Sequence, residues 1–237
     1  MVGIIGAMEQ EVRSLEALMV GSRSTEIGSF RYVRGALGGK EAVLLRCGIG
    51  KVNAAIGCAL MLERFAPSWV VNTGSAGGLD FGLTFGDLVV SASALYHDVD
   101  VTAFGYRKGQ MPGSPERFEA DAGLVDLAET AAASLLERGV LPGGTRIVRG
   151  VIASGDVFVH EAGRIAALRR DFPDLAAVEM EGAAIAHACS LFGTPFVIIR
   201  SLSDIAGKES PMKFEEFLPL AAGRSSALVL EMLKGAE

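Results

Sequence analysis

Ala177-Val178-Glu179-Met180-Glu181-Gly182-Ala183-Ala184-Ile185-Ala186 is a short apolar strand that runs through two glutamates into an alanine-rich helix. In open α/β sheets, ligands bind where strands open into helices, because side chains there converge on a crevice. Glu179 and Glu181 stand two apart, so in extended chain they point the same way and Met180 points to the other face. We therefore expect the chemistry of the protein at this strand end.

A second polar strand end follows closely in the chain. Residues 196–199 predict a buried strand, and Arg200-Ser201-Leu202-Ser203-Asp204 comes directly after it. Two parallel strands would bring their polar ends to the same edge of the sheet, which would join Glu181 to this second group. The alternative for each acidic residue alone is helix capping, because Asp and Glu are favoured in the first turn of a helix.

Length and composition bound the class of protein. The 237 residues suit one domain covering 1–237, and half of them are hydrophobic. No apolar run reaches the roughly 20 residues that a membrane helix needs, so the excess indicates buried strands and a subunit interface. The start of the chain does not resemble a signal peptide, which favours a cytoplasmic location. A net charge of −6 argues against a nucleic-acid surface.

The reactive side chains show no metal or nucleophile pattern. Three cysteines without paired spacing indicate reduced core thiols: Cys47, Cys58 and Cys189. The histidines are far apart and lack the spacing of metal ligands. The sequence has neither a P-loop nor a Gly-x-Ser-x-Gly elbow. We expect no metal and no cofactor.

Predicted strands and helices alternate along the chain. Besides the two strands above, strands are expected at 2–5, 29–33, 41–46, 69–73, 88–95 and 146–153, and helices at 12–19, 53–65, 122–137, 160–170 and 215–233. Without repeats or a linker, this order predicts a single three-layer α/β/α domain around a mixed, largely parallel sheet. Residues 97–118 have no clear period, and so long a loop is expected to be functional or to cover an interface.

The glycine-rich stretch Gly74-Ser75-Ala76-Gly77-Gly78 follows one predicted strand, and its glycines would let the backbone approach a ligand closely. It does not fit the dinucleotide-binding fingerprint, because residues 79–83 lack a helical period. The polar groups that remain predict an acid-rich pocket: Glu11, Glu181, Asp204, Arg200, Ser75 and Ser203. Its apolar walls would come from residues that could equally pack in the core: Met8, Ile49, Phe158, Met180 and Phe214. Such a pocket suits a flat base and a centre of developing positive charge.

Several motifs between residues 2 and 233 resemble those of the 5′-methylthioadenosine/S-adenosylhomocysteine nucleosidase family, which has the purine nucleoside phosphorylase-like fold. They are Gly3-Ile4-Ile5-Gly6-Ala7-Met8-Glu9-Gln10-Glu11-Val12, Gly48-Ile49-Gly50-Lys51-Val52, Asn72-Thr73-Gly74-Ser75-Ala76-Gly77-Gly78, Val99-Asp100-Val101-Thr102-Ala103-Phe104-Gly105-Tyr106, Ser154-Gly155-Asp156, Val178-Glu179-Met180-Glu181 and Arg200-Ser201-Leu202-Ser203-Asp204. The resemblance implies hydrolysis of the N-glycosidic bond of these adenine nucleosides by a homodimer. Gln10, His160-Glu161 and Gly182 are local departures from the family pattern.

The resemblance also implies roles for individual residues. Asp204 would be the general acid at adenine N7, with Ser203 placing its carboxyl group. Glu11 would activate the attacking water, supported by Ser75 and Arg200. The resemblance further implies that Glu181 and Met180, beside Glu179, bind the ribose hydroxyls. Phe158 and the backbone of Val159 would contact adenine. The 5′-alkylthio group would be contacted by Met8, Ile49 and Phe214, and by three residues of the partner subunit: Val101, Phe104 and Pro112.

The chemistry of the reaction requires the same division of labour. An oxocarbenium-like state needs a protonated leaving base, a carboxylate near the developing cation and a placed nucleophile. Asp204 must then keep a proton near neutral pH, which requires its pKa to be raised by burial or by neighbouring carboxylates. Glu11 should remain ionised.

Two other functions stay open at this stage. A nucleoside phosphorylase would use phosphate in place of water; Arg46 and Arg200 could serve it, whereas Glu9 and Glu11 would repel the anion. A sensor that binds an adenine nucleoside without turnover is the second. The sequence also leaves open the preference among methylthioadenosine, S-adenosylhomocysteine, 5′-deoxyadenosine and aminodeoxyfutalosine, which differ mainly at the 5′ side.

Overall fold

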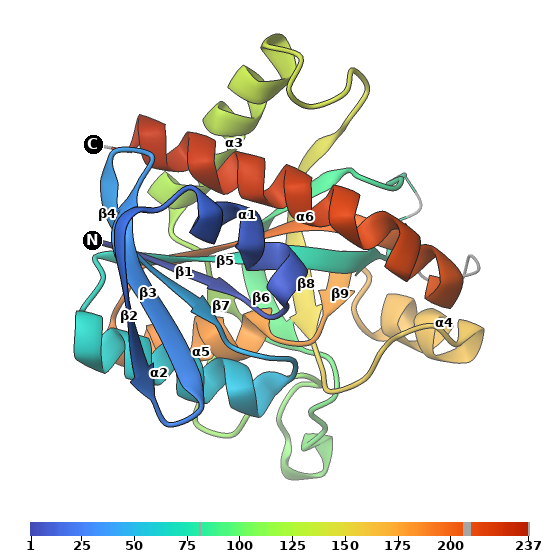
Figure 1. Cartoon of the computed structure of the whole chain (residues 1–237). Coiled ribbons are helices and arrows are strands. Elements are labelled where there is room, and N and C mark those ends of the chain that lie inside the picture. The colour runs from blue at the N-terminus through green and yellow to red at the C-terminus, as the bar shows by residue number, and fades with distance from the viewer. Residues whose placement is uncertain (81, 206–209, 237) are drawn as a thin grey trace.

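A mixed β-sheet separates two layers of helices in the computed structural model, which describes residues 1–80, 82–205 and 210–236, apart from the side chains of 205 and 210–214 (Figure 1). The strands are β1 (Val2–Gly6), β2 (Val20–Ile27), β3 (Phe30–Leu37), β4 (Lys40–Arg46), β5 (Trp69–Gly78), β6 (Leu88–Tyr96), β7 (Phe118–Glu119), β8 (Ile147–Ser154), β9 (Leu175–Glu179) and β10 (Phe196–Ile205). The helices are α1 (Glu9–Ala17), α2 (Lys51–Phe65), α3 (Ala122–Glu137), α4 (Ala162–Asp171), α5 (Gly182–Phe192) and α6 (Ser210–Gly235), with a 3₁₀ turn η1 (Thr102–Phe104).

The helices cover both faces of the sheet, which explains the continuous apolar runs of its strands. In β1, Ile4 packs with residues of α1, α3 and α6 on one face, and the next residue, Ile5, packs with α2 and α5 on the other. A third cluster joins α4 to β8 and β9. The expected three-layer α/β/α architecture is confirmed.

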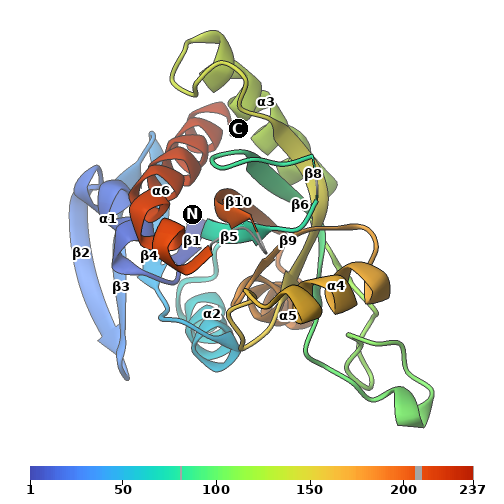
Figure 2. The same cartoon turned by 90° about the vertical axis from the view of Figure 1, so that its right-hand side faces the viewer.

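Five strands form a closed ring in the order β5, β9, β8, β6 and β10, and β1 continues the sheet from β5. β5 pairs in parallel with β1 and β10 and antiparallel with β9, while β10 pairs with β6, β6 with β8 and β8 with β9 (Figure 2). Our expectation that β9 and β10 run parallel is wrong, because β5 is parallel to one and antiparallel to the other. Their polar ends still meet, since Gly77 of β5 pairs with Val178 on one side and Asp204 on the other.

β3, β5 and β10 are longer than the sequence indicates, and β2 and β7 were not predicted. β5 continues through Gly74–Gly78 and β10 through Asp204, because pairing on both sides of β5 overrides the weak strand propensity of glycine. β2 lies at the sheet edge with nearly all of its residues exposed, so it carries no apolar alternation that could reveal it.

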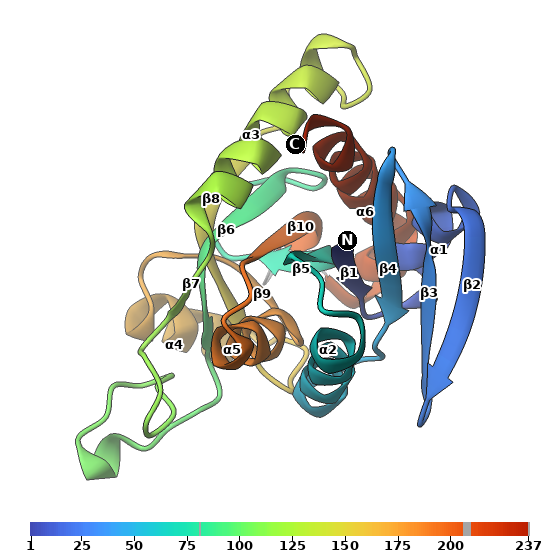
Figure 3. The same cartoon turned by 90° about the vertical axis from the view of Figure 1, so that its left-hand side faces the viewer.

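The remaining predictions concern helices, cysteines and the long loop. α3 has the predicted bounds, and the other helices begin or end within a few residues of theirs. Cys47, Cys58 and Cys189 are buried free thiols, as expected. The 97–118 segment is anchored by buried residues at both ends, His97 and Phe118, and the part between them projects from the body of the molecule (Figure 3). Within the described ranges, no helix combines the length and apolarity that a bilayer span requires.

Candidate active site

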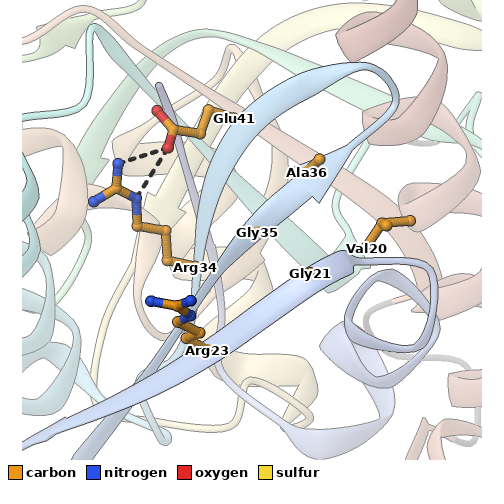
Figure 4. Close-up of a pocket in the computed structure, with 7 residues that line it drawn as sticks. All are labelled: Val20, Gly21, Arg23, Arg34, Gly35, Ala36 and Glu41. Carbon is orange, nitrogen blue, oxygen red and sulfur yellow. Dashed lines mark hydrogen bonds and ion pairs between the residues drawn. The ribbon is translucent and has the colours of Figure 1, made fainter.

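A cavity of about 300 Å³ lies where the ends of β5, β9 and β10 meet the first turn of α1. Its lining contains predicted site residues together with small neighbours: Ala7, Met8, Glu11, Ile49, Ser75, Ala76, Gly77, Phe158, Val178, Glu179, Met180, Glu181, Ser203 and Asp204. Figure 4 shows a second hollow, of about 460 Å³, between β2 and β3. Its Arg34 and Glu41 pair with each other at the exposed surface, so the acid-rich cavity is the better candidate.

Several predicted residues lie elsewhere. Arg200 is buried behind Glu179 and is absent from the cavity lining. Val159 packs its side chain into the core cluster beside α4. Three residues of the 97–118 segment do not line the cavity of their own chain: Val101, Phe104 and Pro112. Phe214 lies in α6, and its side chain falls outside the described part of the structure.

Four neutral donors hold the carboxylate of Glu11, which is only 3% exposed. The backbone N–H groups of Ala7 and Met8 donate to Oε2 at 2.9 and 3.0 Å. The backbone N–H and Oγ of Ser75 donate to Oε1 at 2.9 and 3.1 Å. Because Glu11 stands in the first turn of α1, the positive end of the helix dipole adds to these bonds. This donor set suits a fixed, acceptor-only carboxylate.

Glycines of β5 make room for two carboxylates. A Cβ on Gly74 would lie 2.6 Å from Oε1 of Glu11, and a Cβ on Gly77 would lie 3.2 Å from Oδ2 of Asp204. We expected these glycines to let the backbone approach a ligand. That role stays a prediction, and Gly77 does line the cavity; within the protein, Gly74 and Gly77 also permit the acids to pack against the strand, and so they set the position of both groups.

A β-bulge aims Asp204 at the cavity. Strict alternation along β10 would put Asp204 on the face of Leu202, which packs in the core. The register of β10 against β5 shifts between these two residues, so the extra residue, Ser203, re-aims the one after it. Ser203 Oγ donates to Asp204 Oδ1 at 3.2 Å, and Asp204 is 2% exposed.

Glu179 forms a buried ion pair with Arg200. Nη2 of Arg200 lies 2.5 Å from Oε2 of Glu179, and the N–H of Gly182 and the Oγ of Ser154 also donate to this carboxylate. Burial alone would raise the pKa of Glu179, but the positive charge of Arg200 and these hydrogen bonds outweigh it and lower the pKa. Glu179 therefore stays ionised, and its negative charge compensates the positive charge of the buried Arg200.

Glu181 has a different environment from Glu179. It stands at the N-cap of α5, is 7% exposed, and accepts one hydrogen bond of 2.8 Å from the backbone N–H of Gly50. Burial, followed by the negative charge of Glu179, raises the pKa of Glu181 to about 8. The carboxyl group of Glu181 can thus hold a proton at neutral pH and both donate to and accept from a hydroxyl group.

The structure corrects one detail of the strand prediction and adds residues that the sequence did not single out. β9 ends at Glu179, so the chain is no longer extended at Met180, and Met180 lines the same cavity as both glutamates. Asn72 accepts a hydrogen bond from Arg200 and donates to the Ile5 carbonyl. Its signal in the sequence is an amide side chain that directly follows the apolar residues 69–71 of a buried strand.

In the residues that the structure describes, no group of three or more His, Cys, Asp or Glu side chains is placed to bind a metal ion. That the protein needs no metal or cofactor stays a prediction.

Comparison with known proteins identifies the family. The sequence profile of the Phosphorylase superfamily matches residues 1–234. A curated 5′-methylthioadenosine/S-adenosylhomocysteine nucleosidase of Geobacillus kaustophilus is 54% identical over 230 residues, which cover 97% of this chain and 95% of the relative.

Solved structures agree. The nucleosidase of the same name from Colwellia psychrerythraea, in complex with adenine, is 50% identical with a TM-score of 0.93 and covers 98% of this chain and 93% of its own. That of Neisseria meningitidis, in complex with methylthio-immucillin-A, is 46% identical with a TM-score of 0.94 and covers 99% of each chain. The chain belongs to the phosphorylase superfamily and, within it, to the 5′-methylthioadenosine/S-adenosylhomocysteine nucleosidases.

Proposed function

We infer from this family membership and from the acid-lined cavity that the protein is a hydrolase. It cleaves the N-glycosidic bond of 5′-methylthioadenosine and S-adenosylhomocysteine and releases adenine. The observation that carries this function is the convergence of Glu11, Glu181 and Asp204 on one cavity, each with its own set of hydrogen-bond partners. Glycosidic cleavage through an oxocarbenium-like state needs such acids in separate roles.

We assign the proton transfers to Asp204 and Glu11. Asp204 donates a proton to N7 of the leaving adenine, and the hydroxyl of Ser203 orients its carboxyl group. Glu11 accepts a proton from the attacking water, and the four donors around its carboxylate keep it in place for that step. Ser75 therefore positions the base, whereas Arg200 acts on the site through the charge that it shares with Glu179.

We assign substrate contacts to the side chains on the cavity wall. Glu181 and Met180 bind the ribose hydroxyls, Phe158 stacks on adenine, and Met8 and Ile49 contact the 5′-alkylthio group. Phe158 and Ile49 are 40% and 54% exposed, which fits side chains that a ligand would cover. The contact of the Val159 backbone with the edge of adenine belongs to the same proposal.

The rival reaction, phosphorolysis, lacks cationic partners among the described side chains of the cavity wall. The guanidinium of Arg200 donates its hydrogen bonds to Glu179, Asn72 and the Ile199 carbonyl. Arg46 pairs with Glu9 at the surface, 2.6 Å apart. A phosphate dianion would therefore meet carboxylates first, and electrostatics favours water as the nucleophile.

The test is release of adenine from methylthioadenosine in phosphate-free buffer and again with phosphate added. We expect adenine and methylthioribose at equal rates in both. A sugar 1-phosphate formed only with phosphate would make the protein a phosphorylase. Tight binding of the nucleoside without turnover would make it a sensor. The same assay on S-adenosylhomocysteine, 5′-deoxyadenosine and aminodeoxyfutalosine would rank the substrates by their 5′ groups.

We further propose that the protein is a homodimer whose 97–118 segment completes the 5′ pocket of the partner. Phe104 in this segment is 81% exposed, and Val52 and Ile56 on α2 are also exposed, so apolar surface is available for burial. Sedimentation over a range of concentrations tests the dimer, and a monomer at every concentration would contradict it. The cytoplasmic location and the single domain over residues 1–237 stay predictions.

A further inference from the structure

The N-terminus of α2 is bonded to two loops of the candidate site at once. Gly50, its N-cap, donates its backbone N–H to Glu181, the proposed ribose acceptor, at 2.8 Å. Lys51, the next residue, donates its backbone N–H to Oδ1 of Asp156 at 2.8 Å. Asp156 lies two residues before Phe158, the proposed stacking partner of adenine. Consecutive backbone donors thus link the ribose side of the cavity to its adenine side.

The side chain of Lys51 adds a second set of bonds. Its Nζ lies 2.8 and 2.7 Å from the two carboxylate oxygens of Asp98 and 3.7 Å from Oδ2 of Asp156. Oδ2 of Asp98 in turn accepts the backbone N–H of Asp156 at 3.0 Å. Lys51, Asp98 and Asp156 therefore form a closed ring of bonds, which we name the Lys51 ring.

Two members of the Lys51 ring are less exposed than an ordinary surface ion pair, whereas the side chain of the third, Asp156, is 49% exposed. The side chains of Lys51 and Asp98 are 22% and 17% exposed. Nζ of Lys51 also lies 5.4 Å from the ring centroid of Tyr96, within range of a cation–π contact. Burial would raise the pKa of Asp98, but its bonds to Lys51 and Asp156 outweigh that effect and lower the pKa. Such a network holds its geometry better than an isolated exposed pair, which contributes little.

Backbone geometry makes the same junction tight. Gly50 has φ of +97°, a conformation that L side chains rarely adopt, and a Cβ there would lie 3.2 Å from Oδ1 of Asp156. Gly155 is confined by its neighbour alone, because a Cβ built on it would lie 2.3 Å from Cε1 of buried His97. The loop that carries Phe158 is thus fixed at its root by Lys51 on one side and by His97 on the other.

We propose that Lys51, with Asp98 and Asp156, is a positioning residue that holds the adenine-contacting loop in register with Glu181 and Ile49. This inference rests on the proposed function, because it assigns adenine to Phe158. Among the hydrogen bonds and ion pairs of the described residues, none joins Glu11 on α1 or Asp204 on β10 to the Lys51 ring. Loosening the ring should therefore weaken binding of the base more than it slows the chemical step.

The experiment compares the parent with Lys51→Met, Lys51→Arg, Asp98→Asn and the double variant of Lys51→Met with Asp98→Asn. Lys234→Met is the matched control, because Lys234 pairs with Glu231 at the far end of α6. Three quantities are measured for each protein: the Kd for adenine by calorimetry, and KM and kcat for methylthioadenosine from initial rates. Urea unfolding verifies that each variant is folded.

For Lys51→Met we expect the adenine Kd and KM to rise about 5- to 50-fold and kcat to change less than about threefold, because the loop carries the proposed stacking contact with adenine, and full loss of such a contact weakens binding by about 5- to 150-fold. Lys51→Arg should recover most of the loss because it keeps the charge and the donors. The double variant should be no worse than Lys51→Met, because both changes remove the same ring.

Three results would overturn the inference. The first is an adenine Kd for Lys51→Met equal to that of Lys234→Met, and the second is a fall in kcat as large as the rise in KM. The third is a parent that does not bind adenine, which would remove the proposed function as well. A parent that binds adenine without turnover would refute hydrolysis alone, and the adenine Kd values would still decide the role of Lys51.

Discussion

Replacing Gly74 with alanine should displace the carboxylate of Glu11, the proposed catalytic base, while every charged residue of the chain is kept. The new Cβ would lie 2.6 Å from Oε1 of Glu11, whereas ordinary contact begins at 3.4 Å, so the carboxylate must move by about 0.8 Å. The backbone can accept alanine, because Gly74 is not among the glycines with positive φ. The steric effect on Glu11 is therefore isolated.

The size of the effect follows from the bonds that would stretch. Ser75 donates to Oε1 at 2.9 and 3.1 Å, and a shift of this size lengthens both beyond useful range. Each hydrogen bond to a charged group contributes about 1.5–3 kcal/mol. A misplacement of ~1 Å lowers a rate by about 10²-fold. We expect kcat/KM for methylthioadenosine to fall by about 100-fold in Gly74→Ala, which corresponds to ~2.7 kcal/mol.

Two further variants serve as comparisons for Gly74→Ala: Gly77→Ala introduces a milder clash, and Gly163→Ala introduces none. A Cβ on Gly77 would lie 3.2 Å from Asp204 Oδ2, a clash that a shift of a few tenths of an ångström relieves, so we expect a loss below about tenfold. Gly163 in α4 has no atom within 4 Å of such a Cβ and should leave activity unchanged. The assay is initial-rate adenine release, with urea unfolding in parallel. If Gly74→Ala lost no more activity than Gly77→Ala, the reasoning from contact distances would be refuted.

Three further changes test separate parts of the site. Asp204→Asn should lose about 10²- to 10⁴-fold in kcat while still binding adenine, because it removes the general acid alone; a rate like that of the parent would take Asp204 out of the mechanism. Phe158→Ala should raise the adenine Kd about 5- to 150-fold, since stacking on an aromatic ring contributes about 1–3 kcal/mol per base, and an unchanged Kd would contradict its assignment. Burial and the charge of Glu179 raise the pKa of Glu181 to about 8, so the folded protein binds the extra proton more strongly than the unfolded chain does. The stability that this proton contributes is present in full below about pH 4.5 and is lost as the pH rises to about 8, so free energies of unfolding from urea titrations should fall with pH in the parent and less in Glu181→Gln; equal slopes would refute the shift.

Much of the fold follows from local patterns. The bounds of α3 and the approximate limits of β1, β6, β8 and α2 agree with the apolar periodicity and the turn residues of the sequence. The apolar residues that define these elements in the sequence are the ones that pack in the core, so local preference and tertiary structure agree. Several predicted site residues line the cavity for the same reason, among them Glu11, Glu181 and Asp204, because each stands close to the end of an element whose existence the sequence predicts.

The sequence could not supply the geometry that joins those ends. Whether β9 runs parallel or antiparallel to its neighbour depends on pairing between distant segments, and the sequence of neither strand encodes it. The shift at Ser203 is likewise a property of β10 against β5. The sequence predicts Arg200 at the edge of the site, but in the structure it lies behind Glu179. A buried arginine must be paired, and the carboxylate of Glu179 is the partner within reach.

The pairing of Arg200 with Glu179 explains how three glutamates at one site can behave differently. Glu179 takes the cation and has a lowered pKa, whereas Glu181, two residues later, has one backbone donor from Gly50, is repelled by the charge of Glu179 and has a raised pKa. Glu11 is held by neutral donors from the start of α1 and from Ser75. The donors to the three carboxyl groups come mainly from three different elements: β10 for Glu179, α2 for Glu181 and the start of α1 for Glu11. Glu179 therefore becomes a charged acceptor, Glu181 a carboxyl group that can hold a proton and Glu11 a positioned base only when these elements meet around β5. A single sheet edge with two parallel strands, as the sequence first indicates, would place the carboxylates side by side but would not give them separate partners.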